Sequence, residues 1–191
     1  MPRRVFEYDR PDRFVAGTVG EPGQRTFYLQ VRSGPRLTSV ALEKAQVAAL
    51  AERLTDLLDT LLRRSGAETS IPALVPVDAL DLDPLDGPVE EEFRVGSMSL
   101  EWDEDTECFV LEAFAVVDDD EPDLDDLEAL DSDDSGPDKL RVVLDGPEAR
   151  RFAERAERVV AAGRPPCPFC NQPLDPQGHI CPRQNGHRRR P

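Results

Sequence analysis

The chain has 191 residues and carries 39 acidic against 23 basic side chains, for a formal net charge of −16. This length is sufficient for one domain with a buried core, or for two small ones, so we expect a folded chain. Charged residues interrupt every apolar stretch well before the ~20 residues of a membrane span, and the N-terminus lacks the apolar core of a secretory signal, so we expect a cytoplasmic protein without membrane contact.

Three strands and a helix are predicted in the first part of the chain. Alternating apolar residues predict strands at 14–19, 25–31 and 37–42. Over residues 43–64, apolar residues recur at steps of three and four, which is typical of a helix with one buried face. Residues 1–77 are therefore expected to form a β-β-β-α unit.

An acidic middle part follows this unit. Residues 78–138 sum to −24, whereas residues 1–77 sum to +2 and residues 139–191 to +6. At its start, residues 78–92 are rich in proline and aspartate, which predicts an acidic linker of irregular structure. The acidity of the chain is thus concentrated in its middle.

A second β-β-β-α unit is predicted at 93–163. Strand patterns lie at 93–100, 107–117 and 140–144, and a helical pattern covers 147–162. A proline near the start of this helix and a glycine after its end are typical helix boundaries.

A dense acidic loop is inserted into the second unit at 118–138. Repulsion between its like charges opposes compaction, so we expect a surface loop. Leu124, Leu127 and Leu130 are spaced by three on this acidic background, which leaves open a short docking segment.

The two predicted units also match in sequence. Leu50 to Arg53 corresponds to Phe152 to Arg155 at an offset of 102 residues, and the same offset aligns Val40 with Val142. The sequence therefore predicts an internally duplicated α+β fold, with antiparallel sheets and two packed helices.

Metal-ligating residues gather near the C-terminus. Cys167 and Cys170 form a Cys-x-x-Cys pair, and Cys181 follows, a grouping that predicts a tetrahedral zinc site. His179 is favoured as the fourth ligand because only a short loop is needed to bring it to the pair, and His187 is the alternative. Four protein ligands leave no open position, so we expect a closed, structural zinc knuckle.

A basic tail ends the segment 164–191 that holds this knuckle. Its arginines are Arg183, Arg188, Arg189 and Arg190. Arginines beside a zinc site are typical of a nucleic-acid surface, but an acidic body repels a polyanion. Nucleic-acid or nucleoprotein binding through the knuckle and these arginines is therefore the alternative to a protein partner.

The motifs at the two ends of the chain resemble those of a known family. The opening run from Phe6 to Gly20 reads FEYDRPDRFVAGTVG, and the closing run from Cys167 to Gly186 contains Cys-Pro-x-Cys and Asp-Pro-x-Gly-His-x-Cys-Pro-Arg-x-Asn-Gly. Together they resemble the actinobacterial conserved hypothetical proteins of the DUF3090 family. The resemblance covers nearly the whole chain and implies a cytoplasmic, actinobacterial context without implying an activity.

The expected function is that of a non-enzymatic interaction or adaptor protein with a structural zinc ion and a protein partner. The sequence contains no Gly-x-Ser-x-Gly elbow and no His-Glu-x-x-His helix. A small-molecule enzyme with a cleft between the two repeats would have to use Asp9, Arg13 or Arg25, and it is the third hypothesis.

Overall fold

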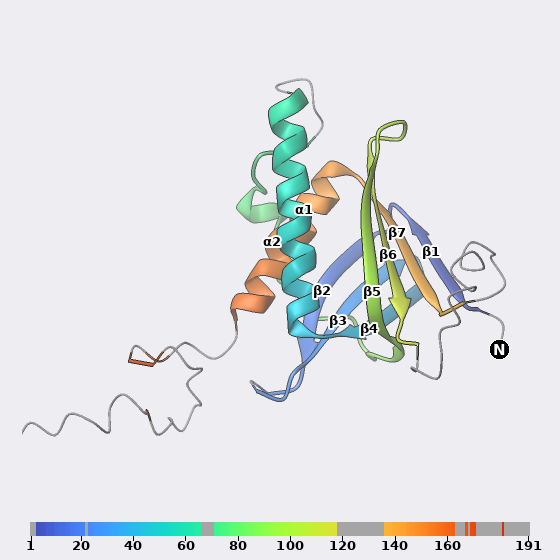
Figure 1. Ribbon diagram of the computed structural model, residues 1–191, viewed down its shortest axis with the longest axis vertical. Coiled ribbons are helices and arrows are strands. Elements are labelled where there is room, and N and C mark those ends of the chain that lie inside the picture. The colour runs from blue at the N-terminus through green and yellow to red at the C-terminus, as the bar shows by residue number, and fades with distance from the viewer. Residues whose placement is uncertain are drawn as a thin grey trace, which may run out of the picture.

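The computed structural model describes residues 3–21, 23–65, 71–117 and 136–162, together with Cys167, Phe169, Cys170 and Cys181. These residues form a seven-stranded sheet, two long helices and a 3-10 turn (Figure 1). The strands are β1 (Val5–Asp9), β2 (Arg13–Val19), β3 (Thr26–Ser33), β4 (Arg36–Leu42), β5 (Glu91–Asp103), β6 (Cys108–Ala115) and β7 (Lys139–Leu144). The helices are α1 (Lys44–Ser65) and α2 (Gly146–Ala161), and the turn is η2 (Val77–Ala79). The predicted α+β class is confirmed.

The same order of elements occurs in both halves of the chain. β2, β3 and β4 form an antiparallel meander that leads into α1, and β5, β6 and β7 form another that leads into α2. Lys44 opens α1 two residues after the end of β4, and Gly146 opens α2 two residues after the end of β7. The β-β-β-α order is thus present twice, and the common origin of the halves remains an inference from sequence.

The predicted antiparallel pairing is observed within each half, but the two halves form a single mixed sheet. The strand order is β1-β7-β6-β5-β4-β3-β2, and two neighbouring pairs are parallel. Ser39 of β4 lies opposite Glu91 of β5, and Val5 of β1 lies opposite Lys139 of β7. Alternation of apolar residues is the same in both kinds of sheet, so it does not report the direction of a strand that arrives through a long connection. The β4–β5 pair joins both halves into one mixed sheet.

Strand β1 lies outside the elements predicted from the sequence. Charged residues surround its apolar side chains, which weakens the strand pattern. Its Tyr8 is nevertheless buried, and the Tyr8 and Thr38 hydroxyls form a hydrogen bond of 2.8 Å. Because Thr38 belongs to β4, the sheet curls until its β1 edge reaches β4.

The hydrophobic core lies between the sheet and the two helices and draws on both halves. Leu54 and Leu58 of α1 are buried in it, as are Phe109 of β6 and Phe152 of α2. The rings of Phe14 on β2 and Phe152 stack with their centroids 4.5 Å apart. A strand of the first half and a helix of the second therefore share one packed contact.

The start of α2 is fixed by a capping box. The Asp145 carboxylate accepts from the backbone N–H of Glu148 at 2.8 Å, and the Glu148 carboxylate accepts from the backbone N–H of Asp145 at 3.2 Å. These two bonds satisfy N–H groups that the helix itself leaves without partners. The cap places the first turn of α2 against β2.

Some predicted features lie outside the described residues. Residues 118–135, which make up most of the acidic loop and include Leu124, Leu127 and Leu130, are among them. At the end of that loop, Asp138 forms an ion pair of 2.6 Å with Arg4. In the described part of the chain, no helix is both long and apolar enough to cross a membrane.

Replacing Phe152 with alanine tests the shared core. Phe152 is 1 % exposed and stacked on Phe14, so Phe152→Ala is expected to lower the free energy of unfolding by about 3–5 kcal/mol through lost burial and a cavity. Urea denaturation measures this change. Val116→Ala, at a side chain 51 % exposed, is the control and should change the free energy by less than about 0.5 kcal/mol. Equal effects of the two substitutions would contradict the shared core.

Candidate functional site

Three cysteines converge near the C-terminus, as the sequence predicts. The Sγ atoms of Cys167, Cys170 and Cys181 all lie within 4.8 Å of one another. Cys167 and Cys181 are both buried, and their Sγ atoms are 3.9 Å apart. A Cys-x-x-Cys turn and a cysteine from later in the chain thus supply three sulfur atoms around one point.

The spacing of these sulfur atoms fits a metal ion. Tetrahedral zinc with Zn–S bonds of about 2.3 Å sets its ligand sulfurs about 3.8 Å apart, close to the 3.9 Å between Cys167 and Cys181. A disulfide would need about 2.05 Å between two sulfurs, and no disulfide joins any two of these cysteines. The geometry matches that of a thiolate metal site and not that of an oxidised pair.

The surroundings of Cys167 favour its thiolate form. Burial raises the pKa of the Cys167 thiol, but the backbone N–H groups of Cys170 and Phe169 and the thiols of Cys170 and Cys181 outweigh that effect, so the net pKa is lowered. Hydrogen bonds donated to a sulfur stabilise its anion. The thiolate is also the form of cysteine that binds metal ions.

The other predicted residues of the C-terminal site lie outside the described residues. These are the two candidate fourth ligands, His179 and His187, and the tail arginines Arg183, Arg188, Arg189 and Arg190. Cys108, the fourth cysteine, lies on β6, where it is buried and accepts a hydrogen bond of 3.5 Å from Arg10. It is not part of the cysteine triad.

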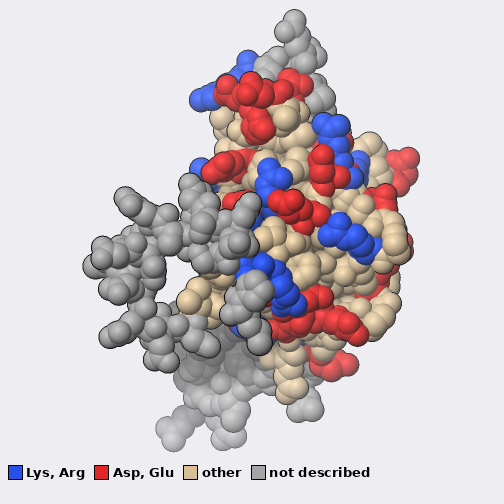
Figure 2. Space-filling view, turned by 90° about the vertical axis from the view of Figure 1, so that its right-hand side faces the viewer, with Lys and Arg blue, Asp and Glu red and all other residues tan. Residues whose placement is uncertain are grey.

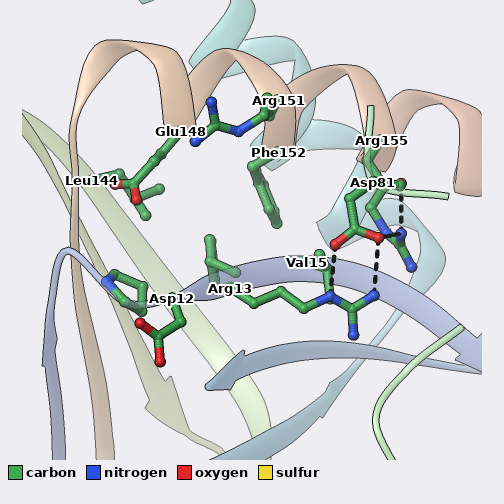
Figure 3. Close-up of a pocket in the computed structure, with 11 residues that line it drawn as sticks. Asp12, Arg13, Val15, Asp81, Leu144, Glu148, Arg151, Phe152 and Arg155 are labelled. Carbon is green, nitrogen blue, oxygen red and sulfur yellow. Dashed lines mark hydrogen bonds and ion pairs between the residues drawn. The ribbon is translucent and has the colours of Figure 1, made fainter. Parts of the chain in front are cut away.

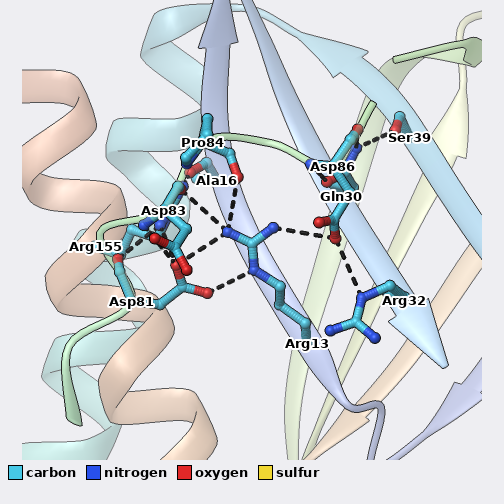
Figure 4. Close-up of polar contacts among 10 residues, drawn as sticks. All are labelled: Arg13, Ala16, Gln30, Arg32, Ser39, Asp81, Asp83, Pro84, Asp86 and Arg155. Carbon is cyan, nitrogen blue, oxygen red and sulfur yellow. Dashed lines mark hydrogen bonds and ion pairs between the residues drawn. The ribbon is translucent and has the colours of Figure 1, made fainter. Parts of the chain in front are cut away.

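A second cluster, of charged side chains, surrounds residues 71–90. These residues connect the two halves, and we call them the strap. Most of the predicted acidic linker belongs to the strap, and its backbone crosses β2 and α2 (Figure 4). Arg13 of β2 donates to both carboxylate oxygens of Asp81, at 2.6 and 3.0 Å, and pairs with Asp86 at 3.1 Å. It also donates to the carbonyl oxygens of Asp83 and Pro84.

Arg155 of α2 holds the same strap from the other side. Its guanidinium donates to the Asp81 carboxylate at 2.7 Å and to the carbonyl oxygens of Asp81 and Asp83 at 2.6 and 2.7 Å. Its Nε donates to the carbonyl oxygen of Ala16, on β2, at 2.8 Å. The side chains of Arg13 and Arg155 are each only 10 % exposed, so Asp81 is the carboxylate shared by two nearly buried cations.

Asp81 is held in its charged form. The hydrogen bond from Arg13 and the charge of Arg155 lower the pKa of the Asp81 carboxyl, against the opposing effect of burial. Burial lowers the pKa of Arg155, but guanidinium groups are not deprotonated in proteins. The cluster therefore contains two cations and a shared anion, with Asp86 as a further anion on Arg13.

A small cavity adjoins this cluster, between β2 and the first turns of α2 (Figure 3). It measures about 80 Å³, and its lining includes Arg13, Asp81, Glu148 and Phe152, together with Leu144 of β7. Sites for small-molecule ligands usually measure about 300 Å³ or more. The space suits a few water molecules and is too small for a substrate.

The residues proposed for an enzyme do not converge on this cavity. Arg13 lines it, but the guanidinium of Arg13 is occupied by Asp81 and Asp86. Arg25 instead donates to the carbonyl oxygen of Ala162 at 3.0 Å, and neither Arg25 nor Asp9 lines the cavity. The described residues thus give the enzyme hypothesis no common site.

One feature of the sequence indicates the arginine cluster, although the prediction of helices and strands does not use it. Arg155 lies three residues after Phe152 and one before Ala156, which places it on the buried face of the helix. A buried arginine requires acceptors, so aspartates from elsewhere in the chain are expected beside it. The pattern does not reveal that these are Asp81 and Asp83 of the linker.

The comparisons with known proteins give a family and nothing beyond it. A family model described as a protein of unknown function (DUF3090) matches residues 6–181, which include all three cysteines of the triad. No curated protein and no solved structure matches the chain. Any statement about activity therefore rests on the geometry of the chain itself.

Replacing Asp81 with asparagine tests the role of the arginine cluster. Asp81→Asn leaves two nearly buried guanidinium groups without their shared anion, so the free energy of unfolding at neutral pH is expected to fall by about 2–3 kcal/mol. Urea denaturation measures it, and Asp78→Asn, an exposed aspartate of the same strap, is the matched control.

The pH dependence supplies a second readout for Asp81. Because the folded-state pKa of Asp81 is lowered, its contribution to stability is complete above the unfolded pKa of about 4 and is lost as the pH falls through the folded pKa. The difference between wild type and Asp81→Asn should therefore shrink in acid. A difference that stays constant from neutral pH down into acid would contradict a charge-based role.

Proposed function

The chain belongs to the DUF3090 family, whose description assigns no function. From the geometry of the chain, we propose that it is a non-enzymatic interaction protein that binds a structural zinc ion. The observation that carries the proposal is the convergence of three cysteine sulfurs, two of them on buried residues, within 4.8 Å. Cys167, Cys170 and Cys181 are proposed ligands. His179 is the proposed fourth, with His187 as its alternative.

A structural role for the ion follows from the donor set. Cys₃His is a common ligand set of closed structural zinc sites, whereas catalytic zinc keeps one position for water. Three thiolates also carry more negative charge than the ion carries positive charge, which weakens its ability to polarise a bound water or carbonyl. The ion would instead fix the fold of a proline-rich segment that contains few apolar residues for a core of its own.

A protein partner is favoured over nucleic acid. Residues 1–163 sum to −20, which opposes a polyanion, whereas residues 164–191, which include Arg183, Arg188, Arg189 and Arg190, sum to +4. The described guanidinium groups of Arg13 and Arg155 are committed to Asp81 and are not free for phosphates. Binding of nucleic acid would therefore depend mainly on the tail arginines.

Metal analysis of the purified protein tests the zinc proposal. The expected result is about one equivalent of zinc, lost on Cys167→Ser or Cys181→Ser because each removes a thiolate ligand. Cys108→Ser is the matched control, since Cys108 is buried on β6 and outside the triad, and this variant should keep its zinc. Comparison of His179→Ala with His187→Ala identifies the fourth ligand. Less than about half an equivalent in the wild type, or equal loss from Cys108→Ser, defeats the proposal.

A salt titration against labelled single-stranded RNA and duplex DNA tests the preference for a protein partner. Because the acidic body repels phosphates, no binding is expected even at low salt. Binding that weakens with salt and disappears when residues 182–191 are deleted would instead establish the nucleic-acid alternative.

A further inference from the structure

The strap exposes three large apolar side chains to solvent. Leu74, Val77 and Leu82 are 78 %, 85 % and 72 % exposed, whereas Ile71 and Val75 of the same strap are buried. The three exposed residues lie at and around the η2 turn, which Figure 1 shows beside the helices on the side away from β5, β6 and β7. Single exposed apolar residues are normal, but several gathered on one short ordered segment are typical of an interaction site. We call Leu74, Val77 and Leu82 the ridge.

Side chains of α2 form hydrogen bonds with the backbone that carries the ridge. Arg150 donates to the carbonyl oxygen of Pro72 at 3.1 Å, and Glu154 accepts from the backbone N–H of Val75 at 3.2 Å. Arg155 donates to the carbonyl oxygens of Asp81 and Asp83 on the other side of η2. The strap is thus anchored before the ridge, between its members and after it. A ridge fixed in this way loses little conformational freedom on binding, which favours association.

Acidic side chains lie beside the ridge and restrict what can cover it. Asp78 is exposed, and it forms no ion pair with any residue in the described part of the chain. Asp83 contributes its carbonyl oxygen to Arg13 and Arg155, and the charge of its exposed side chain acts on Arg155 without a close ion pair between them. A surface that covers the ridge therefore meets the exposed carboxylate of Asp78, and basic groups at its rim would complement that charge.

A second copy of the chain does not meet this requirement. Two ridges placed face to face would bring their own aspartates together, which is unfavourable. The apolar groove between α1 and α2 is acidic at its edges as well. Its lining residues are Ala48, Ala51, Glu52, Thr55, Asp56, Glu157, Val160 and Ala161. Charge complementarity thus disfavours the pairing of two ridges, or of a ridge with this groove, and favours a different protein.

We propose that the ridge docks into an apolar groove of a partner protein whose rim carries lysine or arginine side chains. This inference rests on the proposed function as an interaction protein and gives that function a surface. The apolar side chains would fill the groove, and Asp78 and Asp83 would pair with its basic rim. The cysteine triad would stabilise the chain elsewhere and take no direct part in this contact.

Site-directed crosslinking followed by affinity measurement tests the proposal. The photo-reactive residue p-benzoylphenylalanine is placed at position 77 of the full chain, or at position 117 as a control, because Val117 is 68 % exposed but lies beyond β6. After crosslinking in the host cell, the adduct specific to position 77 is identified and that protein is purified. Its affinity is then measured for the wild type, Leu82→Asp, Asp78→Lys and the matched control Val117→Asp.

The expected result is an adduct with a different protein whose affinity falls at least about tenfold with Leu82→Asp and with Asp78→Lys, and stays unchanged with Val117→Asp. All variants should retain the unfolding temperature and zinc content of the wild type, so failure of the ridge is distinguishable from failure of the zinc site. The proposal is overturned if position 77 gives no specific adduct, if the adduct is a second copy or the chain's own tail, or if Leu82→Asp binds as tightly as the wild type.

Discussion

The ion cluster of Arg13, Asp81 and Arg155 is the interaction on which the arrangement of the two halves depends. Arg13 belongs to a strand of the first half, Arg155 to the helix of the second, and Asp81 to the strap that connects them. Each guanidinium is nearly buried, so each must be fully hydrogen-bonded to offset the cost of losing water. The strap provides these acceptors in its carboxylates and carbonyl groups. A segment without regular structure is thereby given a fixed path.

This cluster shows that part of the acidic middle of the chain is ion-paired in the folded protein. A net charge of −24 over residues 78–138 suggests a solvated and self-repelling segment. In the described part, however, many of its carboxylates have basic partners: Asp81 and Asp86 pair with Arg13, Glu92 and Asp138 with Arg4, and Glu112 with Lys139. Figure 2 shows basic side chains interspersed with acidic ones over the face of the molecule that β1 adjoins. Charge that is separated along the sequence is thus partly paired in space.

Local patterns predict the elements of this fold well and their relations less well. The helix predicted at 147–162 is observed as Gly146–Ala161, because periodicity, Pro147 and the capping residues all act within a few positions. The parallel pairing of β4 with β5 and the position of β1 depend on contacts between distant residues, which alternation does not encode. The site divides in the same way. The spacing of Cys167, Cys170 and Cys181 predicts their convergence, whereas the partners of Arg155 come from a segment more than seventy residues earlier in the chain and give no local signal.

The chain thus combines one mixed sheet with two helices, a strap held by two nearly buried arginines and a triad of clustered cysteines that could hold a metal ion. Zinc K-edge X-ray absorption on the purified protein tests the central claim about the triad most directly. The account predicts three sulfur ligands at about 2.3 Å and one nitrogen at about 2.0–2.1 Å, with no coordinated water. A shell of nitrogen and oxygen alone, or fewer than three sulfurs, would contradict a closed structural site.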